Sequence, residues 1–137
     1  MIEFQRIYFE HLDIVNASKQ IGAIIAKRAA VGDSNGRYQY SLYAFRAVLD
    51  VVRASESKER IFRVISCQIL VRELEKEFRQ PCKIDMPAGE DECSAIAEIY
   101  SLGLGYVQPK ENCKVTIEFS DGDKILGSLS VPLLFSN

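Results

Sequence analysis

The stretch Cys113–Phe119, CKVTIEF, alternates apolar and polar residues, and Ile125–Val131, ILGSLSV, does so again after Asp121-Gly122. Strict alternation is typical of a half-buried β-strand, and an Asp-Gly pair between two such runs is typical of a tight turn. These residues therefore predict an antiparallel β-hairpin near the end of the chain.

The register of this hairpin is predicted from the requirement that its apolar side chains lie on one face. A loop of residues Ser120 to Gly122 pairs Ile117 with Ile125 and keeps the apolar side chains on one side of the hairpin. It also places Gly122 at the left-handed position of a bulged hairpin, which glycine adopts at little cost. We therefore expect this register.

Three segments before the hairpin show apolar residues at intervals of three and four, the spacing of an amphipathic helix. The sequence predicts helices over Phe4–Ala30, Tyr38–Ala54 and Lys58–Arg79, with Pro81 ending the third because proline disfavours a helical residue before it. Two parts of these segments, residues 2–9 and 61–71, are rich in β-branched and aromatic residues, so a strand stays open as the alternative there.

A short fourth helix is predicted from the stripe of Cys93, Ile96, Ala97 and Tyr100, ended by glycines, and Gly103–Val107 is a candidate third strand. The expected fold class is α+β, in which three N-terminal helices and the short fourth helix pack against a C-terminal hairpin or small sheet. A length of 137 residues fits a single domain, 1–137.

Charge is unevenly distributed along the chain. Residues 19–63 carry a net charge of +5 and residues 80–137 a net charge of −5, while the whole chain carries −2. Two halves of opposite charge can cancel by folding against each other, or they can leave one charged face that steers a partner. Cancellation is the simpler interpretation.

Several classes of site lack their sequence signals. The four cysteines are irregularly spaced and His11 is the only histidine, so we expect neither a metal site nor a cofactor. His11 has no neighbouring nucleophile in sequence, and we assign it no catalytic role. Gly32–Arg37 lacks the pattern of a phosphate-binding loop. These absences favour a protein that is not an enzyme.

Location in the cell is predicted from two further absences. The start, Met1–Phe4, lacks the basic and apolar pattern of a signal peptide, and no apolar run is long enough to cross a membrane. With four cysteines expected to be reduced, the chain is expected to be cytoplasmic.

The leading functional hypothesis is a protein-binding module that occupies the surface of another, basic protein, as a small bacterial immunity or antitoxin-type inhibitor does. Such a protein needs a complementary surface and no chemistry. A homo-oligomer is compatible with this role. The candidate partner-binding residues are the two acidic clusters, Glu90, Asp91, Glu92, Asp121 and Asp123.

Two alternatives stay open. A small-molecule-binding or enzymatic domain could use a pocket between the helices and the hairpin. A helix-turn-helix-like nucleic-acid binder could use the helices predicted on either side of the basic residues Arg53, Lys58, Arg60 and Arg63. The acidic residues Glu56 and Glu59 among them argue against nucleic acid, which is therefore the weakest hypothesis.

Overall fold

The computed structural model describes residues 2–12, 20–32 and 36–136, and in these ranges the chain forms β-strands, turns and one short 3-10 helix. The strands are β1 (Ile2–His11), β2 (Ile24–Gly32), β3 (Tyr38–Arg53), β4 (Ile61–Val71), β5 (Lys76–Met86), β6 (Glu92–Val107), β7 (Lys114–Asp121) and β8 (Lys124–Ser136). The α+β prediction, with three N-terminal helices and a fourth, is therefore wrong.

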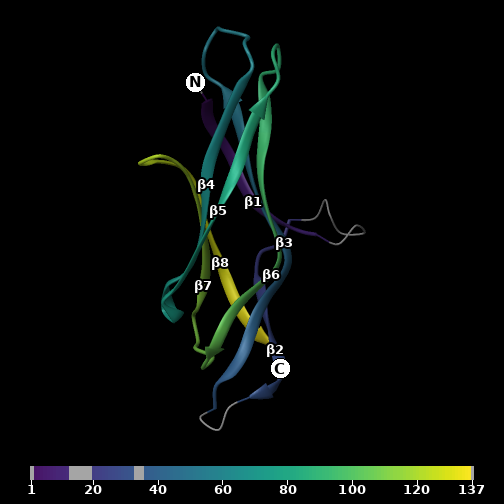
Figure 1. Cartoon of the computed structure of the whole chain (residues 1–137), viewed down its shortest axis with the longest axis vertical. Helices are drawn as coiled ribbons and strands as arrows, with labels where there is room; N and C mark the ends of the chain where they lie inside the picture. The colour runs from purple at the N-terminus through teal and green to yellow at the C-terminus, as the bar shows by residue number, and fades with distance from the viewer. Residues whose placement is uncertain (1, 13–19, 33–35, 137) are drawn as a thin grey trace.

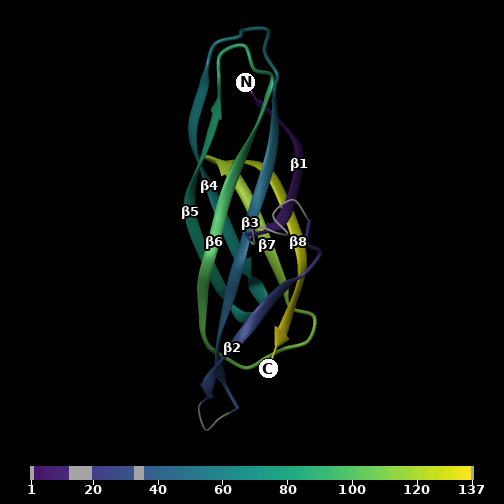
Figure 2. The ribbon, with the colours of Figure 1, turned by 90° about the vertical axis from the view of Figure 1, so that its right-hand side faces the viewer.

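All eight strands belong to one curled sheet with the order β1-β3-β2-β8-β7-β4-β5, and β6 pairs with the other edge of β3. Figure 1 shows two layers, one made by β1, β3 and β6 and the other by β4, β5, β7 and β8. Strand β8 joins the layers, because it pairs with β7 along most of its length and then runs parallel to β2. Figure 2 shows β3 and β6 crossing in front of the second layer.

The core lies between the layers and draws side chains from every strand. Phe9 of β1 and Phe45 of β3 meet edge to face, with ring centroids 5.8 Å apart. Strands β5 and β6 come together where the sheet curls, and the Cys82 thiol lies 3.2 Å from the carbonyl oxygen of Ile96. Burial of these alternating side chains favours the two-layer arrangement.

Strand β3 explains why the segment Tyr38–Ala54 resembled a helix. Ala44 adopts a left-handed backbone conformation, φ +52°, in the middle of the strand. Before Ala44 the buried positions are Tyr40 and Leu42, and after it Phe45 and every second residue to Val51 are buried, together with Val48 on the other face. The change of parity creates a spacing of three, which mimics the helical intervals on which the prediction relied.

The other predicted helices are strands for related reasons. Phe4–Ala30 contains β1 and β2, and the predicted stripe residues Ile14 and Ala17 lie outside the described residues. Of the two open alternatives, the strand interpretation is correct for both residues 2–9 and residues 61–71. β-Branched side chains pack well on a pleated surface, and this preference prevailed over the helical spacing.

The segment Lys58–Arg79 contains β4, a 3-10 turn (Arg72–Leu74) and the start of β5. Glu75 reverses the chain with a left-handed conformation, φ 55°. Pro81 does not end a helix but lies inside β5, where it is tolerated because β5 is at the end of the sheet order. In β6, Ile96 and Tyr100 of the predicted helical stripe are exposed.

The C-terminal hairpin is confirmed, but its predicted register is wrong. Asp121 pairs with Lys124 across the residues Gly122 and Asp123, and a bulge follows between Phe119 and Ser120. Ile117 consequently faces Leu129, and Ile125 is 60% exposed. Gly122 does adopt the left-handed conformation, with φ +61°. The segment Gly103–Val107 is a strand, but it continues β6 along β3 and does not extend the hairpin.

Candidate functional site

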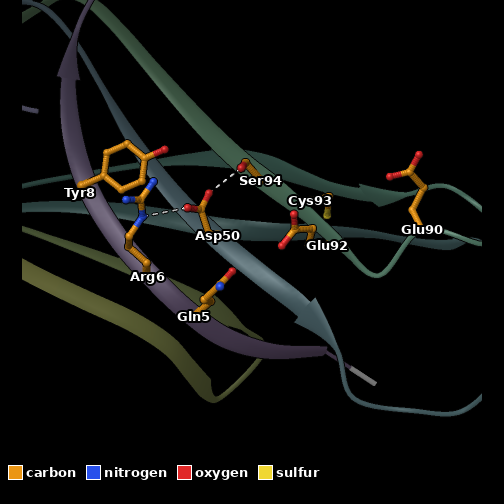
Figure 3. Close-up of a pocket in the computed structure, with 8 residues that line it drawn as sticks. All are labelled: Gln5, Arg6, Tyr8, Asp50, Glu90, Glu92, Cys93 and Ser94. Atoms are coloured by element: carbon orange, nitrogen blue, oxygen red, sulfur yellow. Dashed lines mark hydrogen bonds and ion pairs between the residues drawn. The ribbon is translucent and has the colours of Figure 1, made fainter. Parts of the chain in front are cut away.

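A polar hollow of about 650 Å³ lies on the outer face of β1, β3 and β6. The register brings three strands together there, because Arg6 lies opposite Asp50 and Asp50 lies opposite Ser94. Outward-facing residues of adjacent strands become neighbours in this way although they are far apart in sequence. Figure 3 shows these side chains and the others that line the hollow.

Asp50 is the centre of the hydrogen bonds in this hollow. The Arg6 Nε donates to one Asp50 oxygen at 3.0 Å, and the Ser94 hydroxyl donates to the other at 2.5 Å (Figure 3). The Arg6 guanidinium also lies over the Tyr8 ring, 4.3 Å from its centroid. The hydrogen bond to Asp50 raises the pKa of Arg6, so this charge is fixed.

Glu90 and Glu92 line the same hollow at the end that lies near the loop between β5 and β6 (Figure 3). Neither carboxylate forms an ion pair with a described residue. Glu92 faces Val52 of β3, and Glu3 of β1 faces Val52 from the opposite side. Two carboxylates thus line a hollow whose own aspartate is already neutralised by Arg6, and Glu3 lies on the neighbouring strand.

The two loops at this end are held by Arg53, whose side chain is only 1% exposed. Its guanidinium donates to the carbonyl oxygens of Ser57 at 2.9 Å and Glu59 at 2.7 Å in the loop after β3, and of Glu90 at 2.9 Å in the loop after β5. A planar guanidinium suits several acceptors at once. Arg53 therefore helps to fix the backbone that carries Glu56, Glu59 and Glu90, together with the hydrogen bond from the Gly89 N–H to the Lys58 carbonyl oxygen.

The acidic end is defined here as the carboxylates of Glu3, Glu56, Glu59, Glu90 and Glu92. Figure 1 shows that the start of β1 and the loops after β3 and β5 lie at the same end of the molecule. The five side chains are exposed, and none pairs with a described cation. Lys58 is next to them, but it is paired with Asp91.

The five predicted partner-binding residues are divided between two places. Glu90, Asp91 and Glu92 lie at the acidic end, whereas Asp121 and Asp123 lie at the tip of the β7–β8 hairpin (Figure 1). Two of the five are already paired within the chain. Lys58 lowers the pKa of Asp91 by hydrogen bonding to it, and Arg63 contacts Asp121 at 2.7 Å.

Arg6, Asp50, Ser94 and Arg53 were not predicted as a group. Forty-four residues separate Arg6 from Asp50, and the same number separates Asp50 from Ser94. Only the register of a sheet brings them together, and Tyr38–Ala54 had been interpreted as a helix. An alternating pattern with one change of face at Ala44 would have placed Asp50 on the outer face of a strand.

The cysteines are poor nucleophiles in this fold. Cys67, Cys82 and Cys113 are buried and Cys93 is half-buried, and all four are free thiols. Burial raises the pKa of Cys67 to about 12, with a smaller contribution from Cys82, so its thiol is protonated at neutral pH. His11 is exposed on β1. In the described ranges no group of three His, Cys, Asp or Glu side chains could hold a metal ion.

No protein-family model matches the chain, and no curated protein is significantly similar to it in sequence. Within the described residues, no helix has the length and apolar character needed to cross a bilayer. The helix-turn-helix interpretation is wrong, because the segments on both sides of Arg53–Arg63 are the strands β3 and β4. For the same reason, the described residues contain no helices that could form a pocket with the hairpin.

Proposed function

We propose that this chain is a protein-binding module that contacts a basic partner through its acidic end. The observation that carries the proposal is the pair Glu90 and Glu92, which lack a cationic partner in the described chain and border the hollow beside Asp50. A lysine or arginine of the partner entering the hollow would meet these carboxylates. An immunity or antitoxin-type inhibitor works by occupying a surface in this way.

The fixed loops support this proposal energetically. A partner that binds an already ordered loop does not have to pay for ordering it, so more of the interaction energy becomes affinity. Arg53 supplies this order by joining the loops after β3 and β5. The unpaired carboxylates add long-range attraction, which accelerates association with a basic protein.

The experiment begins with purification of the tagged chain from its native cells at modest salt and identification of any stoichiometric partner by mass spectrometry. Binding kinetics are then measured for two variants. The first changes Glu3, Glu56, Glu59, Glu90 and Glu92 to Gln, and the second changes Asp121 and Asp123 to Asn. We expect the first variant to associate at least about tenfold more slowly at low salt, and the second to associate like the natural chain.

An unchanged association rate in the first variant would exclude the acidic end as the docking surface. A loss confined to the second variant would assign docking to the hairpin tip instead. Both variants leave Arg53, Asp91 and the core unchanged, so circular dichroism and the melting temperature serve as the check that they fold.

A second candidate function is binding of a small polar molecule in the hollow. It is favoured by the hydrogen-bonded set Arg6, Asp50 and Ser94, which gathers a guanidinium, a carboxylate and a hydroxyl in one hollow. A screen of small zwitterionic metabolites should then raise the melting temperature, as binding to the folded state requires. The rise should disappear in Asp50→Asn, and the absence of any rise counts against this function.

A further inference from the structure

Strand β4 is only partly covered on its hairpin side. Strand β7 pairs with β4 from Ser66 to Leu70, and among the described residues no strand pairs with that edge over Ile61–Ile65. Figure 1 shows the β7–β8 hairpin bending away from β4 toward its tip. An exposed edge of this kind presents backbone N–H and C=O groups that can pair with another strand.

A second hollow, of about 560 Å³, lies where the hairpin bends away. Its lining includes Val64 and Ser66 of β4, Arg79 and Pro81 of β5, and Ser120 and Gly122 of the hairpin. Val64 is 57% exposed, and Phe62, two residues earlier on the same face of β4, is 49% exposed. Apolar surface thus adjoins the unpaired edge.

Two polar groups in this second hollow lack partners. The Ser66 hydroxyl oxygen is buried and makes no hydrogen bond with a described residue, a state that costs free energy because the group has also lost water. Arg79 is exposed and forms no ion pair with a described residue. An exposed guanidinium that has no anionic partner among the described residues is complementary to a carboxylate.

We propose that the free edge of β4 receives an extended segment of another protein, which pairs with Ile61–Ile65 as an added strand and places an acidic side chain against Arg79. The occupant must be extended because its backbone has to pair with a strand edge. It must be acidic at one position because the cation there is not neutralised by the chain itself. Its β-branched or apolar neighbours pack on Phe62 and Val64.

This docking site goes beyond the function proposed for the acidic end, since it uses a different layer and the opposite charge. Recognition by strand addition takes its affinity from backbone hydrogen bonds and its specificity from alternate side chains. Arg79 is therefore the residue expected to select the sequence of the bound segment.

The test selects random linear dodecapeptides, displayed on phage, against the full chain. The most enriched sequence is synthesised and titrated into the ¹⁵N-labelled protein. We expect an enriched motif with one Asp or Glu flanked by β-branched residues, and amide shifts concentrated in residues 61–66 and 120–122. No enriched peptide, a motif without an acid, or shifts centred on the acidic end would overturn the proposal.

Variants then assign the contact. Arg79→Gln should weaken binding about tenfold, the range of one charge-assisted hydrogen bond, whereas Arg28→Gln on β2 is the charge-matched control and should bind normally. A peptide whose acidic residue is changed to the corresponding amide should bind the natural chain about tenfold more weakly than the original peptide does. The two peptides should bind the Arg79→Gln variant with equal affinity. If the two changes weaken binding independently, so that their losses of binding free energy add, the contact between the acid and Arg79 is contradicted. The proposal is also contradicted if light scattering shows that the peptide displaces a second copy of the chain.

Discussion

Arg53 shows how one buried side chain can organise an entire end of a β-protein. Its guanidinium reaches carbonyl groups of Ser57, Glu59 and Glu90 in two loops that no strand pairing connects. A cation that is buried this deeply is tolerated because its hydrogen-bonding groups are satisfied by fixed acceptors. The shape of the acidic end therefore depends on a residue that lies beneath it.

We predict that Arg53→Met destabilises the fold by about 3 kcal/mol, because it removes several charge-assisted hydrogen bonds that join the two loops. Urea unfolding measures this loss, and hydrogen exchange should accelerate in residues 54–60 and 87–91. Arg60→Met is the matched control. Arg60 is exposed and makes two hydrogen bonds of 2.9 Å to Asp85, so its loss should cost less than about 1 kcal/mol. Equal losses would refute the role assigned to Arg53.

Gly127 is a second residue whose identity is fixed by its surroundings. A Cβ atom there would lie 2.9 Å from the Leu49 side chain and 3.0 Å from the Phe4 ring, where β8 passes β1. We predict that Gly127→Ala costs about 1–3 kcal/mol, since the core must shift to accept the methyl group.

Gly103→Ala is the control for this prediction, because no atom lies within 4 Å of the position that a Cβ would occupy there and its backbone is not left-handed. Its free energy of unfolding should be unchanged or slightly higher. Thermal denaturation of the two variants tests the prediction, and equal melting temperatures would contradict the close approach assigned to Gly127.

At the scale of the element, the hairpin register has a measurable consequence. Ile117 is fully buried opposite Leu129, whereas Ile125 is 60% exposed opposite Ser120. Ile117→Ala should therefore cost about 3 kcal/mol and Ile125→Ala less than about 0.5 kcal/mol. Comparable losses in urea unfolding would indicate the register in which Ile117 and Ile125 face each other.

The strands also show why helical spacing misled the prediction. In β3 the buried positions change from even to odd numbers at Ala44, and a similar change in β6 occurs between Ile99 and Leu102, after most of the segment that was predicted as a helix. Each change inserts an interval of three into a period of two. Where the alternation is uninterrupted, as in β7 over Val115–Phe119, the strand was predicted correctly from the sequence.

At the scale of the molecule, the uneven charge of the chain is partly cancelled by folding. Lys58, Arg60 and Arg63 of the basic segment pair with Asp91, Asp85 and Asp121 of the acidic segment. This agrees with the simpler interpretation of the sequence. The acidic end is what remains uncancelled near Glu90 and Glu92.

Strand pairing over long sequence distances also predicts how the chain folds. The start of β2 pairs in parallel with the end of β8, and the Ser136 hydroxyl donates to the Ala26 carbonyl oxygen 110 residues away. Such pairings must close long loops before they stabilise anything, so refolding should take roughly milliseconds to seconds. Because the core includes all strands, stopped-flow fluorescence and circular dichroism should report one transition. Separate transitions for the two layers would contradict this.

The sequence by itself determined the C-terminal hairpin, its left-handed Gly122 and the balance between basic and acidic segments, because these follow from local alternation, turn chemistry and composition. The tertiary structure alone decided that Tyr38–Arg53 is a strand, that Arg6, Asp50 and Ser94 meet, and that Arg53 joins two loops. These features depend on which strands become neighbours and in which register. That choice is made by the burial of a common core, a property of the whole chain that no short stretch of it carries.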